Sequence, residues 1–108
     1  MSYKVDTLAP FRKEAKKLIK KYPSLKSELA ELGSQLSKHP TSGVALGNNC
    51  YKIRLGIASK GRGKSGGARV ITHFYLTANT VFLLTIYDKS SKDNIPENYI
   101  KALLELIK

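Results

Sequence analysis

A chain of 108 residues, 42% of them hydrophobic, can form one small domain with one core over residues 1–108 and is too apolar for a disordered protein. Its net charge of +11 would destabilise the fold unless a negatively charged partner binds. Nucleic acid is the first candidate, an acidic protein the second and an anionic membrane the third. No apolar run is long enough to span a bilayer and no signal peptide is recognised. The lone Cys50 excludes an intrachain disulfide, so we expect a cytoplasmic protein.

The N-terminal part of the chain predicts a short strand over residues 3–7 and then two helices. Pro10 suits the first turn of a helix, and this helix ends at Tyr22 because the residue before a proline avoids the α region. Ser24 is the expected N-cap of the second helix, which Pro40 closes. The apolar stripes are Phe11, Ala15, Leu18, Ile19 and Tyr22 in the first helix, and Leu25, Leu29, Leu32 and Leu36 in the second. The short break between them predicts a helical hairpin.

Residues 41–49 are predicted to be a loop, and residues 50–88 to be three strands. The first strand alternates, with Tyr51, Ile53, Leu55 and Ile57 towards the core and Lys52 and Arg54 on the other face. Residues 77–80 suit a hairpin turn with Asn79 left-handed, and residues 81–86 are apolar enough for a strand covered on both faces. Pro96 opens a last helix with Tyr99, Leu103, Leu106 and Ile107 along one side. The expected fold is α+β, in the order βααβββα, with a mainly antiparallel sheet.

Basic residues gather on and around the predicted sheet. No Asp or Glu lies between Leu32 and Tyr87, whereas seven Lys or Arg do, so an external polyanion is the natural partner. Arg69 is expected on the exposed face of its strand. The glycine-rich loop carries Lys60, Arg62 and Lys64, which are spaced to face the phosphates of a nucleic acid, and its glycines let the backbone approach them closely. Lys16 and Lys20 belong to a basic face of the first helix, which is either solvated or a second contact surface for RNA or an acidic partner.

Familiar catalytic sets are absent from the sequence. One cysteine and two distant histidines give no metal-ligand spacing, and no cofactor motif is found. His39 fits a surface residue at a helix end, His73 a structural histidine, and Cys50 a small core residue. The glycine-rich loop joins two strands and has no helix behind it, so it is not a nucleotide-binding loop.

A cluster of arginine and lysine on a sheet can still cleave RNA, because the 2′-hydroxyl of the substrate is itself a nucleophile. Arginines can clamp the phosphate and stabilise the charge that develops in the transition state. A lysine crowded by other cations is disfavoured in its charged form and can transfer protons, which makes Lys52 the candidate base. The alternative is that Lys52, Arg54 and Arg69 form a basic binding face without catalysis.

Three stretches resemble the RelE/ParE superfamily of type II toxin–antitoxin toxins. They are Cys-Tyr-Lys-Ile-Arg-Leu at 50–55, Gly-Ala-Arg-Val-Ile at 67–71 and Phe-Leu-Leu-Thr-Ile-Tyr at 82–87. The loop Lys-Gly-x-Gly-Lys-x-Gly-Gly-x-Arg at 60–69 and the tail Leu-Leu-Thr-Ile-Tyr-x-Lys-x-x-Lys-x-Asn at 83–94 are similar to the HigB-like branch. The resemblance covers about half of the chain, and the N-terminal helices agree with the family in pattern only.

The resemblance implies a small RelE-like RNase domain that acts as a ribosome-dependent mRNA endonuclease in the A site, with the ribosome, mRNA and a cognate helix-turn-helix antitoxin as partners. By motif it assigns catalysis to Lys52, Arg54 and Arg69, and to Lys89 and Lys92 after the last strand. The family's C-terminal tyrosine has no clear match, since Tyr87 is near but differs in motif position. The histidines of some HigB relatives do not coincide with His73.

Two other interpretations stay open at this point. ParE toxins share the fold implied by the resemblance but poison DNA gyrase without nuclease activity, and that branch lacks the full cation cluster. The third interpretation is an RNA-binding module that is not toxic.

Overall fold

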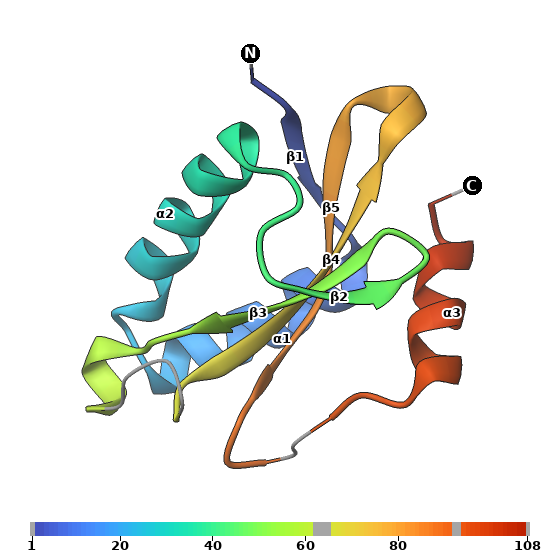
Figure 1. Cartoon of the computed structure of the whole chain (residues 1–108). Helices are drawn as coiled ribbons and strands as arrows, with labels where there is room; N and C mark the ends of the chain where they lie inside the picture. Colours follow the sequence, from blue (N-terminus) through green and yellow to red (C-terminus); the bar gives the residue numbers. More distant parts are fainter. Residues whose placement is uncertain (1, 62–65, 92–93, 108) are drawn as a thin grey trace.

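The protein, described here by a computed structural model for residues 2–61, 66–91 and 94–107, is a five-stranded sheet with helices on both faces (Figure 1). In chain order the elements are β1 (Lys4–Thr7), α1 (Ala9–Lys21), α2 (Leu25–Lys38), β2 (Val44–Gly47), β3 (Cys50–Leu55), the 3-10 helix η1 (Ala58–Lys60), β4 (Ala68–Tyr75), the 3-10 helix η2 (Leu76–Ala78), β5 (Thr80–Asp88) and α3 (Glu97–Glu105). None of the helices within the described ranges is long and apolar enough to cross a membrane.

The sheet has the strand order β1-β5-β4-β3-β2. β1 runs parallel to β5, and the other neighbouring strands are antiparallel, which confirms the predicted α+β class and the mainly antiparallel sheet. β5 lies between β1 and β4, and most of its residues are buried, as its apolar run predicted. Asn79 has a φ of +49° between β4 and β5, so the left-handed turn residue is confirmed.

Strand β2 departs from the sequence prediction, which is a loop over residues 41–49. All four of its residues are exposed, so burial gives no alternating pattern to detect. Asn48 and Asn49 have φ values of +54° and +58°, and two successive left-handed residues are typical of the tight turn that joins antiparallel strands. β2 therefore exists as an edge strand because this turn folds it back onto β3.

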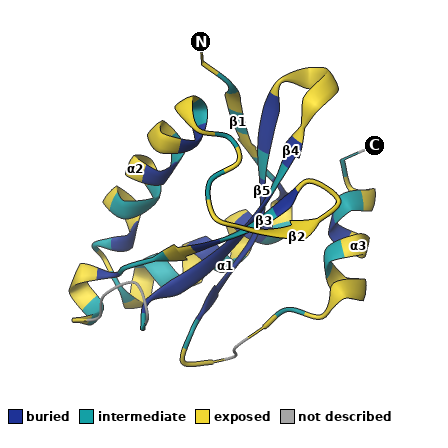
Figure 2. Ribbon diagram, in the orientation of Figure 1, coloured by how far each residue is buried: buried dark blue, intermediate teal, exposed yellow. Residues whose placement is uncertain are grey.

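One hydrophobic cluster lies between the sheet and the first two helices. Figure 2 marks the buried residues of these elements in dark blue. The cluster contains Phe11 and Ala15 of α1 together with Leu25, Leu32 and Leu36 of α2, so both helical stripes are confirmed. β3, β4 and β5 supply the opposing apolar side chains, among them Ile53, Val70, Phe74, Val81 and Ile86.

A second, smaller cluster lies on the other face of the sheet, where α3 packs. Leu103 is buried there, and Ile100, Leu104 and Ile107 are packed against the cluster. The predicted stripe of α3 is therefore wrong at Tyr99 and Leu106, which are 41% and 56% exposed. α3 covers one end of this face only, which leaves the rest to the basic residues described below.

Ser24 stands at the N-cap position of α2, but its side chain does not cap the helix. Its backbone is itself helical, and its hydroxyl bonds to Ser59 at 2.8 Å and donates to Glu28 at 3.2 Å. Ser24 therefore does not cap α2, and its side chain links the start of α2 to η1 instead.

Two glycines give a matched test of this packing. A Cβ at Gly67 would overlap the carbonyl oxygen of Leu55, whereas a Cβ at Gly33 of α2 would meet nothing within 4 Å. We expect Gly67→Ala to lower the free energy of unfolding by about 1–3 kcal/mol, because the backbone of β3 must shift. Gly33→Ala should raise it by about 0.5–1 kcal/mol, because alanine favours a helix. Urea denaturation measures both, and equal effects would contradict the close approach of Gly67 to β3.

Candidate nucleic-acid interface

The register of the sheet brings three predicted site residues onto one face. Arg54 of β3 lies directly opposite Arg69 of β4, and Arg69 lies directly opposite Tyr87 of β5. Residues directly opposite in an antiparallel pair project from the same face. Lys52 is two residues before Arg54, so it projects from that face as well. Lys52, Arg54 and Arg69 therefore lie together, on the face away from α1 and α2, and we call them the cation row.

Lys52 and Arg54 differ in their surroundings. Arg54 is exposed, whereas Lys52 is half-buried and its Nζ donates a hydrogen bond of 3.3 Å to Oδ1 of Asn94. Asn94 lies shortly before α3 in the chain, so this hydrogen bond brings a residue from beyond β5 to β3. Arg54 is thus open to a ligand, and Lys52 is oriented by a neutral side chain that does not neutralise it.

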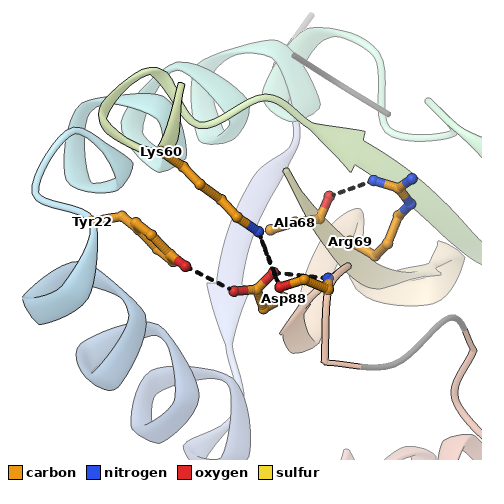
Figure 3. Close-up of polar contacts among 6 residues, drawn as sticks. Tyr22, Lys60, Ala68, Arg69 and Asp88 are labelled. Carbon is orange, nitrogen blue, oxygen red and sulfur yellow. Dashed lines mark hydrogen bonds and ion pairs between the residues drawn. The ribbon is translucent and has the colours of Figure 1, made fainter. Parts of the chain in front are cut away.

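Arg69 is buried, with 4% of its surface exposed, so the expectation that it lies exposed on its strand is wrong. Its Nη1 donates a hydrogen bond of 3.1 Å to the carbonyl oxygen of Ala68, the residue before it (Figure 3). The face is correct, but the guanidinium lies close against the backbone of β4. A substrate phosphate could contact the guanidinium only if the groups that bury this side chain moved away from it.

Tyr87 is a site residue that sequence reasoning left aside. It is buried, 4% exposed, and directly opposite Arg69 in the sheet. Its place in the family motif gives no clear assignment. The pairing register of β4 and β5, which cannot be read from the sequence, is what places its phenol in the same row as the two arginines.

Lys60 does not extend from the basic loop into solvent. Its Nζ lies 2.5 Å from Oδ1 of Asp88 and 3.3 Å from the hydroxyl of Ser90, and also above the ring of Tyr22 (Figure 3). The lysine and aspartate side chains are only 11% and 5% exposed. Because this ammonium group faces Asp88, we leave Lys60 out of the RNA-contacting set proposed below.

The carboxylate of Asp88 is fully occupied. Its Oδ1 also accepts the Ser90 backbone N–H at 3.0 Å and the Ser90 hydroxyl at 2.8 Å, and its Oδ2 accepts the Tyr22 hydroxyl at 3.1 Å. Burial opposes ionisation of Asp88, but the hydrogen bonds from Lys60, Ser90 and Tyr22 outweigh it and hold the pKa of this carboxyl well below its usual range. Asp88 is therefore a permanent anion near neutral pH.

The remaining predicted residues divide into three groups. Lys89 is half-buried, and its backbone N–H donates to the carbonyl of Gly67 at 3.0 Å. Lys16 and Lys20 are exposed on α1, which packs on the opposite face of the sheet, so the structure does not bring them to the cation row. Arg62, Lys64 and Lys92 lie outside the described residues.

A groove of about 860 Å³ runs along the edge of β3 beside α2. Lys52 and Arg54 line one side, and Glu31 and Gln35 of α2 line the other. β2 pairs with β3 only from Cys50 to Lys52, so the later part of β3 has no strand on this side. The groove therefore gives a ligand access to Lys52 and Arg54 from the edge of the sheet, whereas Arg69 does not line it.

The residues described offer neither a metal-ligand cluster nor an activated thiol. No group of three or more His, Cys, Asp or Glu among them could hold a metal ion. Cys50 is buried beside His73, with its Sγ 3.6 Å from Nδ1, and burial raises the pKa of the thiol to about 11. Burial also lowers the pKa of His73, although a hydrogen bond with the Asn48 backbone opposes this. Cys50 is therefore a core thiol, as expected, and His39 is exposed at the end of α2.

Comparison with known proteins gives a family match over most of the chain. The family model described as "RelE toxin of RelE / RelB toxin-antitoxin system" matches residues 11–108. This match does not single out the HigB-like branch, which stays a prediction.

Solved structures of three similar chains share the fold. An arginine-to-alanine double mutant of E. coli toxin RelE in the free state has a TM-score of 0.67 and 19% identity, with all of both chains covered. The toxin–antitoxin complex RelBE2 from Mycobacterium tuberculosis gives 0.58 and 16%, covering 82% of this chain and 92% of that one. The isolated E. coli RelE toxin in another crystal form gives 0.52 and 22%, covering 97% and 99%. At these identities the likeness shows the fold.

The ion pair of Asp88 predicts a specific dependence of stability on pH. Its pKa is lower in the folded protein than in the unfolded chain, where a value near 3.8 applies, so the unfolded chain binds a proton first as the pH falls. The stabilisation is present above about pH 4 and is lost progressively below it. Asp88→Asn leaves Lys60 buried without its anion and should cost about 3–5 kcal/mol at pH 7.

Urea denaturation of both proteins between pH 2 and pH 7 measures this effect. The other carboxylates are common to both proteins, so the difference between the two curves isolates Asp88. We expect that difference to shrink as the pH falls below about 4. A difference that is constant over the whole range would show that the pKa of Asp88 is the same in the folded protein and in the unfolded chain.

Proposed function

The chain belongs to the RelE family of toxin–antitoxin toxins, and we propose that it is an endoribonuclease which cuts mRNA in the ribosomal A site and so stops translation. The observation that carries the proposal is the row in which Arg54 lies opposite Arg69, with Lys52 beside it on the same face. Two arginines and a lysine on adjacent strands can converge on one phosphate, because neighbouring strands are only about 5 Å apart.

The nucleophile in this proposal comes from the substrate. The 2′-hydroxyl of the nucleotide before the cut attacks the adjacent phosphorus and loses its proton to the uncharged amine form of Lys52, which becomes the ammonium ion. Arg54 and Arg69 bind the non-bridging oxygens as negative charge builds on them. The bond to the 5′-oxygen of the next nucleotide breaks, and this oxygen takes up a proton. Tyr87 is our candidate donor, because it carries a hydroxyl in the same row.

The proposed target is mRNA on the ribosome, and the charge of the chain supports a polyanionic partner of this kind. The net charge of +11 favours a dense polyanion, and the exposed Arg54 lies beside a groove that is open at the edge of the sheet. Arg62 and Lys64 are proposed to bind ribosomal RNA from the glycine-rich loop. The proposed protein partner is a cognate antitoxin of the helix-turn-helix type. The complex from M. tuberculosis supports an antitoxin partner in this family.

Removal of single cations from the row tests the site. Lys52→Ala and Arg54→Ala should each lower the single-turnover rate of mRNA cleavage on programmed ribosomes by about 10²–10³-fold, since each loses one group that acts on the transition state. Lys26→Ala, which removes the same charge from an exposed position of α2, is the matched control and should stay within about twofold.

If cells expressing the protein without antitoxin arrest with intact mRNA and damaged DNA, the gyrase poison replaces the nuclease as the function. If they do not arrest at all, the protein is an RNA-binding module. Loss of polysomal mRNA supports the endonuclease.

A modified codon tests the chemistry itself. A 2′-deoxy nucleotide at the cleaved position should abolish cutting and leave ribosome binding unchanged, because it removes the nucleophile only. With the natural codon, the 5′ fragment should end in a 2′,3′-cyclic phosphate or a 3′-phosphate, and EDTA should not inhibit at concentrations that leave ribosomes intact. Mass spectrometry of the fragments distinguishes these ends. A free 3′-hydroxyl on the 5′ fragment would require an activated water instead.

A further inference from the structure

The Lys60–Asp88 ion pair lies where three segments of the chain meet (Figure 3). Lys60 is the last residue of η1, just after β3, and Asp88 is the last residue of β5. Tyr22 follows α1 and bonds to the same carboxylate. Ser90, two residues beyond β5, adds two more hydrogen bonds to Asp88. The pair therefore ties the loop after β3 and the segment after β5 to the end of α1.

The pair is extensively hydrogen-bonded as well as buried. Both oxygens of Asp88 have donors, and Lys60 is held by two oxygen partners and by the ring of Tyr22, whose centroid lies 5.4 Å away. A buried polar network with all its bonds formed has few alternative arrangements. Such a network fixes the positions of the backbone segments that carry it.

The same residues adjoin the cation row through the backbone. Asp88 is the sheet partner of Ala68, and Ala68 is in turn the partner of Leu55. The carbonyl of Ala68 holds the guanidinium of Arg69 at 3.1 Å. The peptide on the other side, Gly67, accepts the backbone N–H of Lys89. Arg69 therefore follows directly on a short piece of β4 that pairs with the end of β3 on one side and with the end of β5 on the other. The ion pair joins the end of β5 to the loop after β3.

The ion pair itself cannot touch the substrate from where it lies. Asp88 follows Tyr87, so its side chain projects from the opposite face of the sheet, towards α1. Its contact with Tyr22 agrees with this placement. An effect of the pair on cleavage would therefore be indirect, and the backbone contacts above connect the pair to Arg69.

We propose that the Lys60–Asp88 pair is a positioning device for the cation row, which fixes the ends of β3, β4 and β5 so that Arg69 meets the phosphate. This inference rests on the proposed endoribonuclease function. Its physical basis is the sensitivity of a transition state to geometry, since a displacement of about 1 Å can lower a rate about 100-fold. Lys60 acts here as the internal partner of Asp88 and not as a phosphate ligand.

The variants must separate positioning from loss of stability. Asp88→Asn breaks the pair, but it leaves a buried lysine without its anion and is expected to destabilise the protein. The double variant Lys60→Met with Asp88→Asn removes both charges and is expected to fold better. Leu36→Val shortens a fully buried side chain of α2 and gives a destabilised control with the pair intact. Glu97→Gln removes an exposed ion pair with Lys101, 3.9 Å long, and is the control for charge.

The cleavage assay uses saturating toxin and ribosomes programmed with one cleavable codon. We expect the double variant to lower the single-turnover rate at least about 30-fold. The toxin concentration for half-saturation should change less than about threefold, because phosphate contacts that carry ribosome binding are kept. Leu36→Val and Glu97→Gln should keep the wild-type rate per folded molecule. A double variant that cleaves at the wild-type rate, or that loses no more activity than Leu36→Val, overturns the proposal.

A crystal structure of the double variant keeps this test independent of the proposed activity. We expect the Arg69 guanidinium to leave the carbonyl of Ala68 when the pair is removed. If it stays in place, the pair does not position Arg69, whatever the cleavage rate. If wild-type protein cuts no mRNA on ribosomes, the proposed function fails by itself, and the position of this guanidinium still decides whether the pair orients Arg69.

Discussion

The antiparallel pairing of β4 with both of its neighbours is the constraint on which the rest of the structure depends. It places Arg69 between Arg54 and Tyr87, and it directs every second residue of β4 to the cluster under α1 and α2. A slip of one residue in either pair would move the arginine to the other face and bury it in that cluster. The same register thus determines both the hydrophobic core and the candidate site.

A bulge in β5 shifts its pairing with β4 by one residue. The pairing shifts between Ile71 and Thr72 of β4, so β5 has one extra residue there. Leu83 and Ile86 consequently face the larger cluster, whereas Leu84 and Tyr87 face the smaller one. The inserted residue changes the alternation, as bulges do. If the residues of β5 alternated strictly from Leu83 onwards, Tyr87 would project towards α1 and not from the face that carries Arg69.

The sequence predicts an element of the fold well when one side of that element is buried and the other is exposed. The alternation of residues 51–57 and the stripes of both N-terminal helices are predicted correctly, because one side of each element is apolar and the other charged. β2 escapes prediction because neither of its faces is buried and only its Asn-Asn turn marks it. The bulge escapes as well, since residues 81–86 are apolar almost throughout and hide any change of alternation.

The sequence predicts which residues form the candidate site, but it does not predict their surroundings in the fold. Lys52, Arg54 and Arg69 do share a face, but the burial of Arg69 and the ion pair of Lys60 depend on contacts between distant residues. Lys60 and Asp88 are 28 positions apart, and no local pattern links them. A signal is nonetheless present, because Asp88 is the first carboxylate after a long stretch whose charged residues are all cations. A single acidic residue at the end of such a stretch, next to an apolar strand, is a strong candidate for an internal counter-ion.

The distribution of charge between the two faces of the sheet follows from these placements. Like charges directly opposite each other on adjacent strands are destabilising, so the pairing of Arg54 with Arg69 is a cost that the fold carries. On the face towards α1, the lysine nearest the strand ends is neutralised by Asp88 inside the protein. On the other face the exposed Arg54 meets solvent beside the groove along β3. A phosphate bound between the two arginines would relieve their repulsion, and relief that grows with the negative charge on the phosphate oxygens favours the transition state over the bound substrate. The unfavourable pairing of Arg54 with Arg69 in the free protein would then favour the binding of a phosphate, and of its transition state most of all.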